Sequence, residues 1–173
     1  FKAVKVGDPC KDADVDMGPL VEKRALESVT AKVEKAVEQG AKILCGGKPI
    51  EGKGYFYPAT LLDNCTQDMN IIHEETFGPV LPIVEFDNID QVIAWANDVE
   101  YGLASSVFTN DIDTATRMCR ELEFGETYIN RENFEAMQGF HAGIKKSGIG
   151  GADGKHGVEE YLVTHVTYLA TQY

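Results

Sequence analysis

The feature that most constrains the fold is an alternation of apolar runs and amphipathic segments between residues 80 and 130. Apolar runs at residues 80–86, 104–109 and 127–130 predict strands, and the segments between them carry apolar residues at helical spacing. Consecutive parallel strands need a crossover connection, usually a helix. The order strand, helix, strand, helix, strand therefore predicts an α/β fold with a parallel sheet and right-handed crossovers.

Polar residues at the start of both intervening segments fit helix N-caps. Asp87 or Asn88 can cap the first helix, because a short polar side chain accepts hydrogen bonds from the free amides of the first turn. Asn110 or Asp111 occupies the same position before the second helix. The buried face predicted for that second helix consists of Ile112, Ala115, Cys119 and Leu122. Cys119 is therefore expected to be a packing residue.

A longer amphipathic segment lies earlier in the chain, at residues 20–39. Its apolar residues recur every four positions with charges between them, which predicts one buried helix face, and Gly40 ends the pattern. That face would consist of Ala25, Val29, Val33 and Val37. Short extended segments are expected after it, at residues 42–45 and 59–62.

Two C-terminal segments differ from the rest of the chain. Residues 131–157 contain seven glycines and no clear period, and a loop of this length inside a domain is more often functional than filler. Residues 161–170 are rich in Val, Tyr and Leu and are expected to form a final strand. Because a terminal strand has an unpaired edge, we expect it to need a partner.

The charge balance narrows the classes of partner. The chain has 28 acidic and 16 basic residues, a net charge of -12, whereas nucleic acids and anionic membranes select basic surfaces. No apolar run approaches the ~20 residues of a membrane span. The chain starts at Phe1 without a signal-peptide pattern, so a processed or truncated start is expected. The four cysteines show no metal-ligand spacing, and a cytoplasmic protein with reduced thiols and no metal is expected.

A set of motifs, most of them containing glycine, runs through the chain in a fixed order. They are Met17-Gly18-Pro19-Leu20, Gly40-Ala41, Gly46-Gly47-Lys48, Gly54-Tyr55-Phe56-Tyr57-Pro58 with Thr60, Glu74-Glu75-Thr76-Phe77-Gly78-Pro79-Val80, Ala96-Asn97 with Tyr101-Gly102-Leu103, residues 125–130, and Ser147-Gly148-Ile149-Gly150. Any one of them occurs by chance, but together they are specific. In order and spacing the set resembles the NAD(P)-dependent aldehyde dehydrogenase superfamily, over almost the whole chain.

The resemblance implies a domain organisation and a reaction. Residues 1–160 would be a C-terminal part of the catalytic domain, and residues 161–173 the oligomerisation strand and tail of a dimer or tetramer. In this family a cysteine thiolate attacks the aldehyde, hydride passes to the nicotinamide, and a glutamate activates water to release the carboxylate. In the family pattern that cysteine and that glutamate lie upstream of Phe1. No catalytic residue is therefore assigned here, and the chain alone is expected to be inactive.

The same resemblance makes three residues candidates for binding NAD. Glu75 would accept hydrogen bonds from the nicotinamide-side ribose, since a carboxylate offers two acceptors to a cis-diol. Phe77 would lie beside the nicotinamide ring as an apolar wall. Ser28, on the first long helix, would approach the adenosine half of NAD, although a solvated surface position is the simpler interpretation for Ser28 and for Lys32. Without the family pattern, residues 74–77 would only end a short helix.

The glycine-rich loop carries the substrate prediction. Many relatives have an aromatic residue followed by a PFGG sequence ahead of SGxG, and these aromatics wall the aldehyde tunnel. Counting back from Ser147 places His141 at the phenylalanine of PFGG, and Glu135 at the aromatic six residues earlier. Because a buried polar group needs a partner, this exchange favours a small hydroxylated aldehyde. Both residues could instead lie on a surface loop, and a shift in register would move the assignment to Asn133 or Phe140.

The loop as a whole looks like that of the lactaldehyde and glycolaldehyde dehydrogenase branch. The predicted reaction is therefore the NAD-dependent oxidation of a small 2-hydroxyaldehyde. A semialdehyde or betaine aldehyde stays open as the substrate, because tunnel residues upstream decide it, and the choice between NAD and NADP also depends on upstream residues. For the isolated chain, a non-catalytic folding or assembly module is the remaining alternative.

Overall fold

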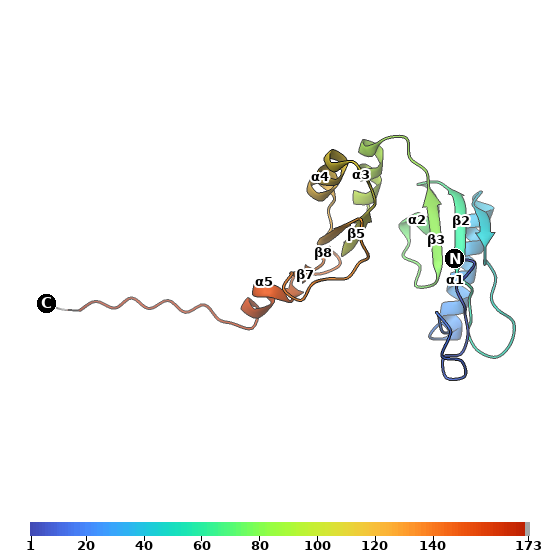
Figure 1. Cartoon of the computed structure of the whole chain (residues 1–173), viewed down its shortest axis with the longest axis horizontal. Helices are drawn as coiled ribbons and strands as arrows, with labels where there is room; N and C mark the ends of the chain where they lie inside the picture. Colours follow the sequence, from blue (N-terminus) through green and yellow to red (C-terminus); the bar gives the residue numbers. More distant parts are fainter. Residues whose placement is uncertain (172–173) are drawn as a thin grey trace. The chain divides into compact units, whose positions relative to one another are not determined.

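The computed structural model describes residues 1–171 and divides into two compact units (Figure 1). Unit 1 is Phe1–Asp87, blue to green in Figure 1, and unit 2 is Asn88–Tyr173, green to red. Each unit has its own strand pairs and its own buried residues. No helix among the described residues is long and apolar enough to cross a membrane.

Unit 1 is built on a mixed sheet. Its elements are α1 (Lys23–Glu38), β1 (Lys42–Cys45), β2 (Thr60–Cys65), α2 (Asn70–His73) and β3 (Val80–Val84). The strand order is β1-β2-β3, with β2 antiparallel to β1 and parallel to β3. Pro82 lies in β3 at the edge of this sheet, where a residue without an N–H is tolerated.

The core of unit 1 joins α1 to the sheet. Val29, Val33 and Ala36 of α1 are buried together with Leu62 of β2 and Tyr57. Val37 is 42% exposed, so the every-fourth pattern predicted for this face is correct only at its centre. The reason is helix geometry: with 3.6 residues per turn, repeated steps of four drift around the helix, and the seventh residue after Val29 stays on the buried face.

Unit 2 is built from two helices and several short strand pairs. Its elements are α3 (Ile89–Asn97), β4 (Tyr101–Gly102), β5 (Ala104–Val107), α4 (Ile112–Glu121), β6 (Glu126–Ile129), β7 (His141–Ala142), β8 (Ile144–Lys145), β9 (Gly151–Ala152) and α5 (Gly154–Glu159). β5 and β6 pair in parallel, with α4 as the connection between them. β4 pairs with β8 and β7 pairs with β9, both antiparallel.

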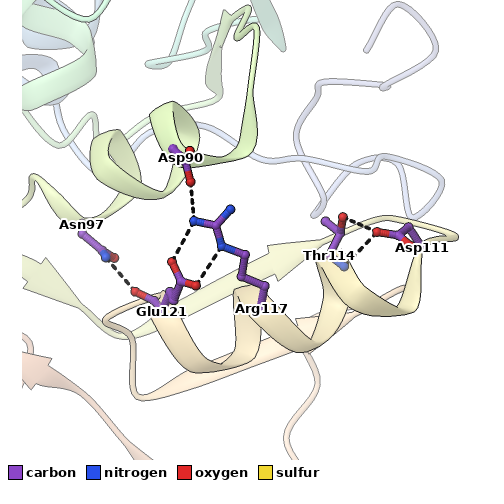
Figure 2. Close-up of polar contacts among 6 residues, drawn as sticks. All are labelled: Asp90, Asn97, Asp111, Thr114, Arg117 and Glu121. Atoms are coloured by element: carbon purple, nitrogen blue, oxygen red, sulfur yellow. Dashed lines mark hydrogen bonds and ion pairs between the residues drawn. The ribbon is translucent and has the colours of Figure 1, made fainter.

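Polar contacts at the surface join α3 to α4 (Figure 2). Arg117 of α4 forms ion pairs with Asp90 of α3 and with Glu121 of its own helix. The side-chain amide of Asn97 donates to the backbone carbonyl of Glu121 at 2.7 Å. Asp90 lies in the first turn of α3 and Asn97 is its last residue, so both ends of α3 are joined to α4.

The structure confirms one of the two alternative caps for each helix. The Asn88 side chain accepts a hydrogen bond from the Gln91 amide at 2.9 Å at the start of α3. The Asp111 carboxylate accepts from the Thr114 amide at 2.9 Å and also from the Thr114 hydroxyl (Figure 2). Each helix thus begins one residue after its cap, as the sequence predicts.

Two predictions about elements are corrected by the structure. The strands expected to share one parallel sheet belong to separate sheets, since β3 pairs with β2 in unit 1 while β5 pairs with β6 in unit 2. Cys119 is exposed and Ile112 is 76% exposed, whereas Ala115 and Met118 are the buried residues of α4. Helix geometry allows either Met118 or Cys119 to share a face with Ala115. The buried face of α4 lies on the Met118 side.

The C-terminal segment has no strand in this structure. Residues 162–171 are exposed and have no ladder partners, and Figure 1 shows them as a drawn-out trace. The strand predicted at residues 161–170 is therefore not found in the isolated chain. Residues 172 and 173, the end of the predicted tail, lie outside the described residues. Residues 131–157, predicted as a loop, contain the short strands β7, β8 and β9 and the start of α5.

Candidate functional site

The loop between α2 and β3 carries the residues predicted to contact NAD. Glu75 is exposed, and the Phe77 ring is 78% exposed. Between them Thr76 turns inward: its hydroxyl is buried without a hydrogen-bond partner among the described residues, and its carbonyl accepts from the Gly78 amide at 2.8 Å. The loop therefore points Glu75 and Phe77 outward and Thr76 inward, as alternating residues of an extended backbone do.

A lysine from α1 holds this loop in place. The Lys32 ammonium donates a hydrogen bond to the backbone carbonyl of Glu75 and lies 3.8 Å from the Glu74 carboxylate. Within residues 1–171 the carboxylate of Glu75 itself takes part in none of the hydrogen bonds or ion pairs found. The solvated position expected for Lys32 is thus incorrect: its side chain is mostly buried against the loop and leaves the Glu75 carboxylate available.

Two hollows lie on unit 1 beside these residues. One, of about 500 Å³, is lined by Phe77, Tyr57 and Pro79 and by the residues of the first motif, Met17, Gly18, Pro19 and Leu20. The other, of about 240 Å³, is lined by Ser28, Lys32 and Lys35 of α1 together with Glu74 and its neighbours on α2. Ser28 is exposed, and it shares this second hollow with two cationic side chains.

In unit 2 the predicted substrate residue His141 belongs to a polar cluster. Its Nδ1 lies 2.9 Å from Oε1 of Glu126, and the Tyr128 hydroxyl donates to Oε2 of Glu126 at 2.7 Å. Glu126 and Tyr128 are two residues apart on β6, so they share one face of the strand. His141 comes from β7, which is fixed by pairing with β9. The cluster thus joins two separate strand pairs.

The three side chains of this cluster shift one another's proton affinity. The hydrogen bond to Glu126 raises the pKa of His141, and the charge of Glu126 adds to this effect. Burial alone would raise the pKa of Glu126, but the hydrogen bonds from Tyr128 and His141 outweigh it and lower that pKa. The hydrogen bond to Glu126 raises the pKa of Tyr128 to about 12. At neutral pH the cluster therefore contains an ionised Glu126 and a neutral Tyr128.

The other predicted substrate residue, Glu135, is close to this cluster but makes no hydrogen bond to it. Glu135 is exposed in the loop before β7, and its charge contributes to raising the pKa values of Tyr128 and His141. His141 is half-buried. The structure thus brings the two predicted residues into one region of unit 2, with His141 held and Glu135 open to solvent.

Sequence reasoning missed Glu126 and Tyr128. The available signal was their i, i+2 spacing on a strand, which places a carboxylate and a phenol on one face. That signal is not specific by itself. It gains meaning only when the fold shows that His141, 15 residues further along the chain, contacts Glu126. Among the described residues, no group of three or more His, Cys, Asp or Glu side chains could hold a metal ion.

Several motif residues make contacts that hold the fold together. The Ser147 hydroxyl accepts from the Gly102 amide at 2.9 Å, so the YGL and SGxG motifs meet where β4 pairs with β8. The Thr60 hydroxyl accepts from the Gly47 amide at 2.9 Å. A Cβ on Gly46 would lie 2.4 Å from that same hydroxyl oxygen, which explains why glycine is needed there.

Comparisons with known proteins agree with the resemblance found in the motifs. The model of the aldehyde dehydrogenase family matches residues 1–167. The chain is 60% identical to lactaldehyde dehydrogenase of Escherichia coli (strain K12) over 169 residues, which cover 98% of this chain and 35% of that protein. It is 47% identical to the 3,6-anhydro-alpha-L-galactose dehydrogenase of Vibrio sp. (strain EJY3), with 96% of this chain and 35% of that protein covered.

Solved structures give the same answer. The crystal structure of Escherichia coli lactaldehyde dehydrogenase matches with a TM-score of 0.92 at 60% identity, over 96% of this chain and 35% of that chain. The NAD⁺ complex of an aldehyde dehydrogenase from Bacillus cereus matches with a TM-score of 0.86 at 37% identity, over 92% of this chain and 32% of that one. The chain spans about a third of the length of these relatives. With its motifs, its fold and these matches, the chain belongs to the aldehyde dehydrogenase family.

Proposed function

We propose that the full-length protein carrying this chain is an NAD-dependent aldehyde dehydrogenase that oxidises small 2-hydroxyaldehydes, such as lactaldehyde and glycolaldehyde, to their carboxylates. The observation that carries the proposal is the polar cluster around His141, at a position where many relatives have an aromatic wall. The 60% identity to a lactaldehyde dehydrogenase supports the same substrate class.

His141 and Glu135 would recognise the hydroxyl group next to the aldehyde. His141 keeps Nε2 without a hydrogen-bond partner among residues 1–171, since its contact with Glu126 uses Nδ1. Glu135 offers carboxylate oxygens from an exposed position in the same region. A hydroxyl can donate to one of these groups and accept from the other. An aldehyde without the hydroxyl would leave them unpaired once the tunnel is closed, which is how a polar site discriminates.

Glu75 and Phe77 fit the nicotinamide side of NAD. The Glu75 carboxylate is exposed and its backbone is held by Lys32, so two acceptor oxygens are available for the two hydroxyls of a ribose. The exposed Phe77 ring offers an apolar face beside it. When bound, NAD accepts the hydride from the substrate.

Ser28 would contact the adenosine half of NAD. It lines the 240 Å³ hollow with Lys32 and Lys35, and this hollow combines a hydroxyl, two ammonium groups and the Glu74 carboxylate. Such a set can bind the hydroxyls and the charged groups of a nucleotide.

None of the four cysteines is proposed as the nucleophile of the reaction. Burial raises the pKa of the Cys65 thiol, which keeps it protonated and weakly nucleophilic. Cys10 and Cys119 are exposed and Cys45 is half-buried, and none of these three forms a hydrogen bond with a candidate general base among the described residues. By the family pattern, the nucleophile and the water-activating glutamate would lie outside these 173 residues, and the isolated chain is expected to form no NADH from aldehydes.

The C-terminal segment would complete an oligomer. Tyr161, Val163, Tyr168 and Leu169 are each more than 80% exposed, an unusual run of apolar residues for a surface segment. Pairing of residues 161–170 with a strand of another subunit would bury these side chains and satisfy the backbone amides. A homodimer or tetramer assembled through this strand follows from the proposal.

The test of this function is a substrate panel with the full-length protein. NADH formation is measured with lactaldehyde, glycolaldehyde, propanal, hexanal, succinate semialdehyde and betaine aldehyde. The highest kcat/KM is expected for the two 2-hydroxyaldehydes. A higher value for hexanal, for the semialdehyde or for betaine aldehyde would replace the proposed substrate while leaving the family assignment intact.

A further inference from the structure

The imidazole of His141 is anchored from outside its own loop. Its partner Glu126 is the first residue of β6, which is fixed by parallel pairing with β5. The Nδ1 to Oε1 distance is 2.9 Å, and only 13% of the Glu126 side chain is exposed. A short contact to a mostly buried carboxylate restricts the ring far more than a contact to a mobile surface residue would.

Each carboxylate oxygen of Glu126 has its own hydrogen-bond partner, and both contacts favour the ionised form. Oε1 faces His141, and Oε2 accepts the hydrogen bond from the Tyr128 hydroxyl at 2.7 Å. Because a carboxylate can only accept, Nδ1 of His141 must be the donor in this contact. The proton of a neutral His141 is therefore placed on Nδ1, and Nε2 is the nitrogen left for a ligand.

We propose that Glu126 is a positioning residue of the substrate site: it holds Nδ1–H of His141 and thereby fixes Nε2 as the group that meets the 2-hydroxyl of the aldehyde. This inference rests on the proposed function, because it assigns a task to the environment of a residue already proposed to contact the substrate. Glu126 itself would touch neither the aldehyde nor NAD. Tyr128 supports it by occupying the second oxygen.

The charges facing His141 all have the same sign. They are Glu126 from β6, Glu135 from the loop before β7 and Asp153 from the segment between β9 and α5, and each raises the pKa of His141. A raised pKa keeps the imidazolium form to higher pH. In that form Nε2–H donates to the hydroxyl oxygen of the substrate, whereas the neutral ring accepts the hydroxyl proton at Nε2. Glu126 keeps the same nitrogen available in both forms.

The first experiment measures the titration of His141 in the 173-residue chain. The four histidines are labelled with ¹³C, His141 is assigned with the variant His141→Gln, and its NMR shift is followed from pH 5 to pH 9. Glu126→Gln is expected to move the titration midpoint of His141 to lower pH. Glu126→Asp, which keeps the charge on a shorter side chain, should give an intermediate midpoint. An unchanged midpoint in Glu126→Gln would overturn the inference.

A matched control makes this result specific. Glu123→Gln removes the same charge three residues away, where Glu123 pairs with Lys145 at 2.8 Å and does not contact His141. The His141 midpoint should stay at its wild-type value in this variant. A midpoint that moves equally in Glu123→Gln and Glu126→Gln would show that loss of any nearby negative charge has this effect, with no special part for the Glu126 hydrogen bond. That result would contradict the proposal.

The second experiment measures specificity in the full-length protein. Glu126→Gln is expected to raise the KM for lactaldehyde about tenfold, since a charge-assisted hydrogen bond no longer orients His141, while the KM for propanal changes little. Its KM–pH profile for lactaldehyde should shift to lower pH together with the His141 midpoint. An equal rise for both aldehydes would refute the positioning role. A wild-type enzyme without any preference for lactaldehyde would instead refute the proposed function, and the NMR titration would still judge the Glu126 contact.

Discussion

At the scale of single residues, the exposure of Glu75 depends on a side chain from another element. Lys32 on α1 binds the backbone carbonyl of Glu75 and pairs with Glu74, so the loop is fixed while the Glu75 carboxylate stays outside the network. The sequence motif selects Glu75 and Phe77 as candidates, and the structure shows both side chains exposed. The motif cannot predict the role of Lys32, because the contact spans 43 positions in the chain and depends on how α1 packs.

The substitution Glu75→Gln tests the cofactor assignment. The KM for NAD of the full-length protein is expected to rise about tenfold, because an amide offers one acceptor where the carboxylate offers two charged ones. The kcat at saturating NAD should change much less. Glu51→Gln is the matched control, since Glu51 is another exposed carboxylate of unit 1. A KM for NAD that is the same in both variants and the wild type would remove Glu75 from the site.

The residues proposed to contact the substrate show a similar limit of prediction. Counting along the glycine-rich loop identifies His141 and Glu135 as polar replacements for aromatic residues, but not the partners of His141. Glu126 and Tyr128 belong to a strand that ends before the loop begins, and only the antiparallel pairing of β7 with β9 brings His141 to them. Contacts between residues that are far apart in the sequence are decided by tertiary packing, which local sequence patterns do not encode.

At the scale of elements, helices and long strands follow the sequence because their signals are local. The caps Asn88 and Asp111 and the ends of α1, α3 and α4 depend on residues within one turn. The two-residue strands β4, β7, β8 and β9 exist only through their partners, and three of them, β7, β8 and β9, lie in the segment predicted as a loop. The exposed Cys119 is an error of the same kind, since the buried side of a short helix is chosen by its neighbours.

The cap of α4 makes a prediction about pH. Hydrogen bonds from the Thr114 hydroxyl and amide lower the pKa of Asp111 below its ordinary value. A lowered pKa means that the stabilisation is present above the unfolded-state pKa and is lost as pH falls through the folded-state pKa. The difference in unfolding free energy between wild type and Asp111→Ala, measured by urea denaturation, should therefore be constant near pH 7 and shrink below about pH 4.

An uncharged cap provides the comparison. Asn88→Ala removes the cap of α3 and should cost about 1 kcal/mol of unfolding free energy at every pH. If the Asp111→Ala difference proved as independent of pH as that of Asn88→Ala, ionisation of Asp111 would not contribute to the cap.

At the scale of the whole molecule, the family motifs hold distant parts of each unit together. Ser147 binds Gly102 across 45 positions, and the Leu20 amide donates to the carbonyl of Tyr55 at 2.9 Å. The order of the motifs therefore predicts the fold well, because each motif is one side of a contact that the fold needs. It does not predict how strands are shared between sheets, and the expected single parallel sheet is replaced by a mixed sheet and a separate parallel pair.

The exposed C-terminal segment makes a prediction about assembly. Removal of residues 161–173 from the full-length protein should convert the proposed dimer or tetramer to a smaller species, because the strand proposed to pair with another subunit is lost. The molar mass is measured by light scattering after size-exclusion chromatography. Removal of residues 172 and 173 alone should leave the mass per particle close to that of the wild type. Identical assembly after both truncations would place the subunit contact elsewhere.

The most direct test of the proposed activity is the ratio of kcat/KM for lactaldehyde to kcat/KM for propanal, measured with the full-length protein and with its variant His141→Phe. These aldehydes have the same carbon chain and differ only by the 2-hydroxyl. The wild-type ratio is expected to be well above one and to fall at least about tenfold in His141→Phe, because the ring nitrogen proposed to meet the hydroxyl is lost. A wild-type ratio near one, or a ratio unchanged in His141→Phe, would contradict the proposal that a polar wall at His141 selects hydroxylated aldehydes.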